Sequence, residues 1–133
     1  MGLDLQNSAG RQWPLIAKLP ISYEDFADGL LQKAVVMPGN SRVVGGGLVI
    51  EEAFDADTTV NVGDEDDADR YAAAVDATEV GHTALTIDGH KYTGKDTIDV
   101  VMNQAVTQGS AMLYVMYMME DRATEVQPAV LDE

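Results

Sequence analysis

Short runs in which apolar and polar residues alternate recur along this chain, and most of them stop at a glycine, proline, asparagine or aspartate turn signal. Alternation places every second side chain on one face of an extended strand. Pro38-Gly39-Asn40 and Asp88-Gly89 are strong turn signals of this kind. Strands recurring at intervals of about eight to twelve residues are typical of two packed sheets. We therefore predict an all-β fold, a β-sandwich or jelly-roll-like domain.

The expected strands cover most of the middle of the chain. They are Leu15–Leu19, Ala34–Met37, Arg42–Phe54, Thr58–Val62, Thr83–Ile87, Lys91–Thr93, Thr97–Val106 and Ala111–Met119. Thr58–Val62 is predicted to be an edge strand, and Asp88-Gly89 has the length and composition of a hairpin turn between its two neighbouring strands. Gly45, Gly46 and Gly47 in the middle of one strand indicate a bulge, a bend or the close approach of another backbone.

Two segments are not assigned to strands. Ser22–Leu31 fits either a short helix or a loop with two buried aromatic residues, and Ser22 followed by Asp25 resembles a helix N-cap. Arg70–Val75 is expected to form a single helical turn.

The two ends of the chain lack the alternating pattern. We expect an N-terminal arm at 1–13, a β-sandwich domain at 14–119 and a C-terminal arm at 120–133. Partner binding through these arms is assigned to four apolar residues in or beside them: Trp13, Pro14, Val126 and Leu131.

Composition excludes several kinds of protein. The chain has 23 Asp and Glu against 8 Lys and Arg, a net charge of −15. Nucleic-acid binding needs basic side chains on the phosphates, and anionic membranes also repel such a chain, so neither is an expected partner. There is no cysteine, which excludes disulfides and cysteine-ligated zinc. We expect synthesis in the cytoplasm, followed by a soluble state or entry into an assembly.

The segment VNVGDEDDADRY at 60–71 is the densest cluster of acidic residues. Asp64, Asp66 and Asp69 have a loop spacing that could converge on a calcium ion, a cation that prefers oxygen ligands, but the order of an EF-hand is missing. The alternative is a solvated acidic turn in which Asp67 or Asp69 pairs with Arg70. Apart from this possible structural calcium, no cofactor is predicted.

No catalytic residues are assigned. The serines lack the context of an activated nucleophile, and adjacent acids in a polar loop do not form the carboxylate pair of a glycosidase. His82 and His90 are interpreted as surface residues near a turn. The protein is therefore expected not to be an enzyme.

The last predicted strand, Ala111–Met119, is apolar on both faces. One face can join the core, while the face of Tyr114, Met116 and Met118 needs cover from a second sheet, a terminal arm or a neighbouring subunit. These three residues are predicted to form a partner or oligomer interface.

Several short motifs between Arg42 and Arg122 together resemble small β-rich virion proteins of tailed bacteriophages. They are VVGGGLV at 43–49, Ala53-Phe54, VGD at 62–64, DRY at 69–71, ALT at 84–86, Thr97-Ile98 and EDRA at 120–123. Some proteins of this kind resemble head decoration, or cement, proteins on the outside of the capsid.

The resemblance implies binding to the major capsid protein on the outer surface of the virion, stabilisation of the head, and assembly as a homotrimer. It supplies no catalytic residue. The alternatives are a tail, neck or fibre component, or a calcium- or carbohydrate-binding β-module that uses the acidic loop.

Overall fold

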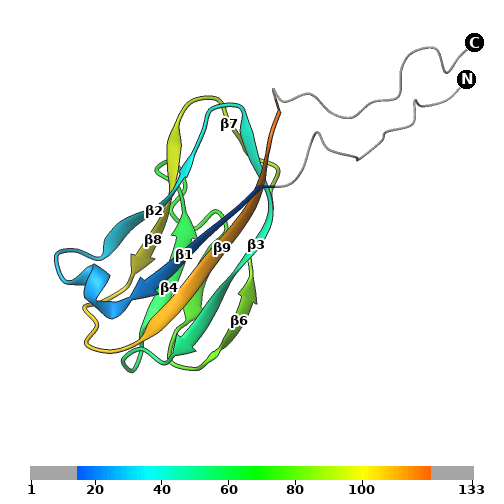
Figure 1. Cartoon of the computed structure of the whole chain (residues 1–133). Coiled ribbons are helices and arrows are strands. Elements are labelled where there is room, and N and C mark those ends of the chain that lie inside the picture. The colour runs from blue at the N-terminus through cyan, green and yellow to red at the C-terminus, as the bar shows by residue number, and fades with distance from the viewer. Residues whose placement is uncertain (1–14, 121–133) are drawn as a thin grey trace, which may run out of the picture.

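The computed structural model describes residues 15–120, and these form a sandwich of two antiparallel sheets (Figure 1). The strands in chain order are β1 (Leu15–Ser22), β2 (Leu31–Met37), β3 (Ser41–Glu52), β4 (Thr59–Gly63), β5 (Ala72–Asp76), β6 (Gly81–Ala84), β7 (Lys91–Tyr92), β8 (Asp96–Met102) and β9 (Ser110–Met119). A 3-10 helix, η1 (Tyr23–Phe26), connects β1 to β2. The predicted all-β sandwich is confirmed.

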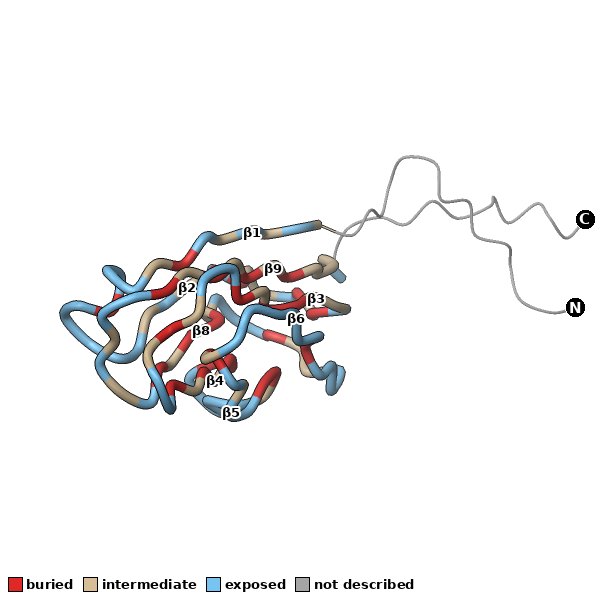
Figure 2. Tube along the Cα trace, turned by 90° about the horizontal axis from the view of Figure 1, so that it is seen from below, coloured by how far each residue is buried: buried red, intermediate tan, exposed pale blue. Residues whose placement is uncertain are grey.

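The strand order is that of a jelly roll. One sheet runs β1-β9-β3-β6, with β7 also paired to β3, and the other runs β2-β8-β4-β5. Because β6 and β7 lie along the same strand, they act as one interrupted edge strand, which leaves eight strands in two sheets. Figure 2 shows these layers edge-on, with β9 and β3 in one and β4 and β5 in the other.

The core lies between the sheets and is filled by the apolar positions of the alternating pattern. Val60 and Val62 of β4 are buried, as are Leu113 and Val115 of β9. Side chains that alternate in this way put one face of each strand into the core and leave the other face outside. Of the two apolar faces of the last predicted strand, the face of Leu113 and Val115 is therefore the one that joins the core.

The Ser22–Leu31 segment contains the short helix that the sequence left open. The Asp25 carboxylate accepts a hydrogen bond from the Ser22 backbone N–H at 2.8 Å, and the Ser22 hydroxyl accepts one from the Glu24 N–H at 3.3 Å. This reciprocal capping satisfies backbone donors at the start of a helix. Phe26 is buried, whereas Tyr23 is partly exposed, so only one of the two aromatic residues joins the core.

Three sequence predictions are wrong at the level of pairing. Thr58–Val62 is not an edge strand, because β4 lies between β8 and β5. Arg70–Val75 does not form a helical turn, because β5 pairs with β4 and places Val75 opposite Val60. Both errors have one cause: local composition does not reveal which strands supply hydrogen-bond partners.

The third error concerns the Asp88-Gly89 hairpin. Gly89 does adopt the positive φ of a turn, +80°, but the strands on either side of it pair with β3 and not with each other. Arg42 of β3 donates a hydrogen bond to the Gly89 carbonyl at 2.7 Å. The turn therefore lies in the connection between β6 and β7, and the position of these two strands is set by their pairing with β3.

The predicted arms lie outside the described residues, apart from Glu120. Trp13, Pro14, Val126 and Leu131 are all in this undescribed part of the chain. Within residues 15–120, no helix is long and apolar enough to cross a membrane.

A cavity-forming substitution tests the core. Leu113→Ala is expected to lower the free energy of unfolding by roughly 2–5 kcal/mol, because Leu113 is fully buried between the sheets. Val36→Ala, at a strand residue that is 56% exposed, should change it by less than about 0.5 kcal/mol. Urea unfolding followed by fluorescence measures both, and equal effects would contradict the described packing.

Candidate functional site

The outer face of the first sheet is the principal candidate for a binding surface. Cross-strand partners share a face, and the register places Ile16 opposite Met116 and Lys18 opposite Tyr114. Ile16 is 65% exposed, whereas Leu113 and Val115 point the other way and are fully buried. We use the name β9 face for the outward side chains Ile16, Val49, Met112, Tyr114, Met116 and Met118.

Glycines of β3 form the floor of the β9 face. A Cβ on Gly45 would collide with the Met116 methyl group, and a Cβ on Gly47 would collide with the His82 ring and the Tyr114 hydroxyl. Met116 and Tyr114 therefore lie close against the β3 backbone, in space that a side chain at Gly45 or Gly47 would enter. The glycine run shows the predicted irregularity, a register shift between Val43 and Gly45. It also shows the predicted close approach of another backbone, because a Cβ on Gly46 would collide with the Tyr114 carbonyl of β9.

Tyr114 is held in place on this floor. Its hydroxyl lies 2.9 Å from His82 Nε2, within hydrogen-bond distance. The two rings are stacked, with centroids 6.0 Å apart and planes 17° apart. The sequence did not predict this contact. His82 of β6 and Tyr114 of β9 come together only because both strands pair with β3, one on each side.

The second sheet packs against the opposite side of this sheet. On the β9 face, Ile16 is exposed, whereas Met112, Tyr114, Met116 and Met118 are half-buried. The structure therefore brings Tyr114, Met116 and Met118 together on one face, as predicted. An apolar face of this kind, with Lys18 at its border, is typical of a surface that contacts another protein.

One corner of the first sheet is bordered by ion pairs. The Glu120 carboxylate accepts a hydrogen bond from Arg42 Nε at 2.7 Å, and its other oxygen lies 3.3 Å from Lys91 Nζ. The hydrogen bond from Arg42 holds the pKa of the exposed Glu120 carboxyl below its ordinary value, with help from Lys91. Surface pairs contribute little stability, but these link β3 and β7 to the end of β9.

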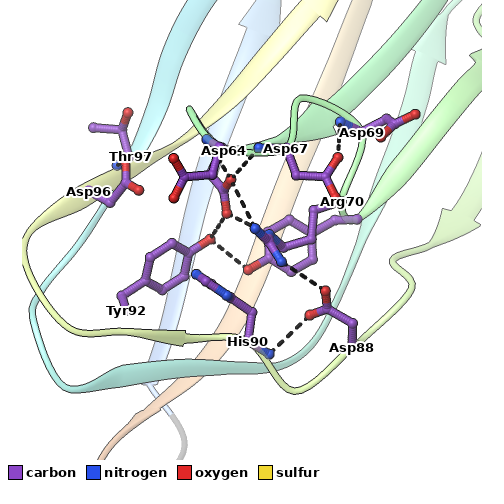
Figure 3. Close-up of polar contacts among 11 residues, drawn as sticks. Asp64, Asp67, Asp69, Arg70, Asp88, His90, Tyr92, Asp96 and Thr97 are labelled. Atoms are coloured by element: carbon purple, nitrogen blue, oxygen red, sulfur yellow. Dashed lines mark hydrogen bonds and ion pairs between the residues drawn. The ribbon is translucent and has the colours of Figure 1, made fainter.

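The acidic loop after β4 is organised around a buried carboxylate. Asp64 is only 2% exposed, and its Oδ2 accepts hydrogen bonds from Arg70 Nε at 2.7 Å and from the Tyr92 hydroxyl at 2.8 Å (Figure 3). Its Oδ1 accepts the backbone N–H groups of Asp66 and Asp67 at 3.1 and 2.9 Å. Asp64 therefore points inward and holds its own loop.

The same cluster connects the two sheets. Arg70 reaches Asp88 at 3.0 Å, and the hydroxyls of Tyr71 and Tyr92 lie 2.6 Å apart. Arg70 and Tyr71 precede β5 in one sheet, while Tyr92 belongs to β7 in the other. Buried polar groups that are fully hydrogen-bonded favour one specific packing, so this cluster fixes how the sheets meet at this end.

Burial and hydrogen bonding oppose each other at these groups. Burial raises the pKa of Asp64, but hydrogen bonds from Arg70 and Tyr92 lower it by more, so the pKa lies below its ordinary value. Burial lowers the pKa of Arg70, but hydrogen bonds to Asp64 and Asp88 outweigh it and raise the pKa. Burial raises the pKa of Tyr71 to about 12 and also raises that of Tyr92.

The predicted calcium ligands do not converge. Asp64 is committed to Arg70 and Tyr92, whereas Asp66 and Asp69 are exposed. In the described part of the chain, no group of three His, Cys, Asp or Glu side chains is placed to hold a metal ion. The expected partner of Arg70 was also wrong: it pairs with Asp64 and Asp88, not with Asp67 or Asp69.

Comparison with known proteins finds similarity in structure only. No protein-family model and no curated protein matches the chain. Three solved phage capsid structures each contain a chain of similar fold. One is the acidic stable capsid of Helicobacter pylori bacteriophage KHP30, with a TM-score of 0.67 and 19% identity over 92% of this chain and 96% of that one.

The second is the cyanophage Pam1 capsid asymmetric unit, with a TM-score of 0.70 and 20% identity over 90% of this chain and 94% of that one. The third is the capsid of Ralstonia phage GP4, with a TM-score of 0.62 and 16% identity over 84% and 87%. At these identities the comparison shows a shared fold across nearly the whole of each chain.

The Asp64 cluster predicts a specific response to acid. Because the folded-state pKa of Asp64 is depressed, its contribution to stability is present above the unfolded-state pKa, about 4. That contribution is lost as the pH falls through the lower folded-state pKa. Asp64→Asn should lower the free energy of unfolding at neutral pH by roughly 3–5 kcal/mol and flatten its decline below about pH 4.

The matched control is Asp76→Asn. Asp76 is exposed, and hydrogen bonds from Thr78 lower its pKa, so we expect Asp76→Asn to change stability at neutral pH much less than Asp64→Asn does. Urea unfolding at a series of pH values measures both variants. Equal losses at neutral pH would show that the buried ion pair is not important for stability.

Proposed function

We propose that this protein is a non-enzymatic decoration, or cement, protein of a bacteriophage capsid. It binds the outer surface of the head and stabilises the shell by bridging capsid subunits. The observation that carries the proposal is the fold match to capsid structures, which spans 92% of this chain and 96% of the chain in the KHP30 capsid. The match therefore spans nearly the whole of both chains.

The β9 face supports this role. A decoration protein needs a surface that buries apolar area against its neighbours, and Tyr114, Met116 and Met118 supply one on a rigid sheet. Methionine adapts its shape to a partner, while a buried tyrosine contributes both apolar area and a polar group. We propose that this face contacts the major capsid protein or a neighbouring copy, together with Trp13, Pro14, Val126 and Leu131 of the terminal segments.

The charge of the chain supports an outer location. A net charge of −15 is unfavourable next to packaged DNA, whose phosphates repel acidic surfaces. The same charge keeps free copies apart in the cytoplasm where they are made. We propose a homotrimer on the capsid, since closed symmetric oligomers bury apolar faces without leaving open contacts.

A tail, neck or fibre component is the alternative within the virion, and the fold alone fits it as well. It differs in copy number, with tens of copies per particle and not hundreds. A calcium- or carbohydrate-binding module is the alternative outside the virion. It has less support, because Asp64 is occupied by Arg70 and Tyr92.

Binding to undecorated heads tests the proposal. The wild-type protein should add back to heads that lack it and raise the temperature at which they rupture. Met116→Glu places a charge in the proposed contact and should lower the affinity for heads about tenfold or more, which is 1.4 kcal/mol or more. Sedimentation of heads with bound protein, quantified by mass spectrometry, gives the occupancy.

Val80→Glu is the matched control, since it adds the same charge at a residue that is 68% exposed and lies outside the β9 face. It should bind like the wild type. No binding of the wild-type protein to heads would contradict the decoration role. Equal binding by both variants would instead contradict only the assignment of the β9 face.

A further inference from the structure

The second sheet carries a groove on its outer face that neither the fold nor the proposed function requires. It has a volume of about 210 Å³. Leu31 of β2 and Val101 of β8 line its apolar part, and Asp96, Thr97 and Asp99 of β8 line its polar part. The loop after β4 forms one wall through Glu65.

Asp99 is a buried carboxylate in this groove with only one hydrogen-bond donor beside it in the described part of the chain. It is 5% exposed, although it lies on the outer face of its strand between the core residues Ile98 and Val100. Its Oδ1 accepts the Thr97 hydroxyl at 2.7 Å, and its Oδ2 accepts no hydrogen bond from any residue in 15–120. A buried carboxylate is costly unless a cation or several donors pair with it.

The reason for the burial is the path of the acidic loop. Gly63 pairs with Asp99 across the sheet. A Cβ on Gly63 would collide with the backbone of Asp67 and Ala68. The loop therefore folds back over Gly63, because glycine leaves the space, and it shields the neighbouring Asp99 from solvent. Asp64 holds the loop in this position through Arg70.

The basic residue opposite Asp99 in the sheet does not form an ion pair with it. Lys33 of β2 lies opposite Asp99 in the strand register and also lines the groove. It is exposed, and no ion pair joins it to Asp99 in the described structure. The groove thus combines an apolar floor, a buried carboxylate with a free acceptor oxygen, and two further acids at its side, Asp96 and Glu65.

We propose that this groove binds the guanidinium group of an arginine side chain presented by a partner protein. The aliphatic part of an arginine packs on Leu31 and Val101, and its planar fork donates to Asp99 Oδ2. The strongly acidic charge of the chain draws a basic partner toward the groove. This inference does not rest on the proposed function, since it holds for any partner that presents an arginine.

The test is an NMR titration of the full chain with two probes. N-acetyl-arginine amide should shift the amide signals of Leu31, Thr97 and Val101 in a saturable way, with millimolar affinity because a single side chain is bound. N-acetyl-citrulline amide has nearly the same shape without the charge, and it should produce no saturable shift. Asp99→Asn keeps the Thr97 hydrogen bond but loses the charge, so it should weaken arginine binding about tenfold or more.

Two further variants complete the test. Asp76→Asn removes one negative charge on the exposed end of β5, and it should bind like the wild type. Lys33→Met removes the competing cation and should bind arginine more tightly. If Asp99→Asn does not fold, Lys33→Met decides the matter, because weaker or unchanged binding overturns the proposal.

Other results would also overturn it. They are the absence of a saturable shift with the arginine probe, equal shifts with the citrulline probe, and unchanged binding by folded Asp99→Asn. Saturable shifts of the same signals with calcium chloride, and none with arginine, would identify a metal site instead. Failure of this titration leaves binding to heads through the β9 face unaffected, so the two proposals are separable.

Discussion

The antiparallel pairing of β3 with β9 is the constraint on which the rest of the structure depends. These are the two longest strands, and they lie side by side in the middle of the first sheet. The pairing joins Ser41 to Met119 and Glu52 to Ser110, so it brings together segments that are far apart in the sequence. The glycines of β3 make it possible on the outer side, because Met116 and Tyr114 occupy the space that larger side chains would need.

The buried ion pair of Asp64 with Arg70 holds the loop after β4 in one conformation. It also reaches Tyr92 on the opposite sheet, and through the loop it shields Asp99. Breaking such a pair is costly because the remaining partner stays buried without its counter-charge. One acidic residue therefore determines the shape of the loop and of the groove beside it.

The two outer surfaces differ in character. The β9 face consists of half-buried apolar side chains beside the exposed Ile16, whereas the groove on the other sheet is small and holds a buried carboxylate. A broad apolar face gains free energy from area, and a charged groove gives selectivity for one kind of side chain. In the proposed role on a capsid, the β9 face would supply most of the adhesion, and the groove would select where a partner docks.

The sequence by itself determined the fold class and the grouping of Tyr114, Met116 and Met118 on one apolar face of β9. It also showed the capping pattern of Ser22 and Asp25, although it left a helix and a loop both open there. These follow from side-chain periodicity and local hydrogen bonding, which need only neighbouring residues. Tertiary structure alone decided that β4 lies inside its sheet and that β6 and β7 both pair with β3. It also decided that Asp64 points inward to Arg70 and Tyr92. Strand partners and buried ion pairs join residues far apart in the chain, and no local pattern records which of several acids will meet the arginine.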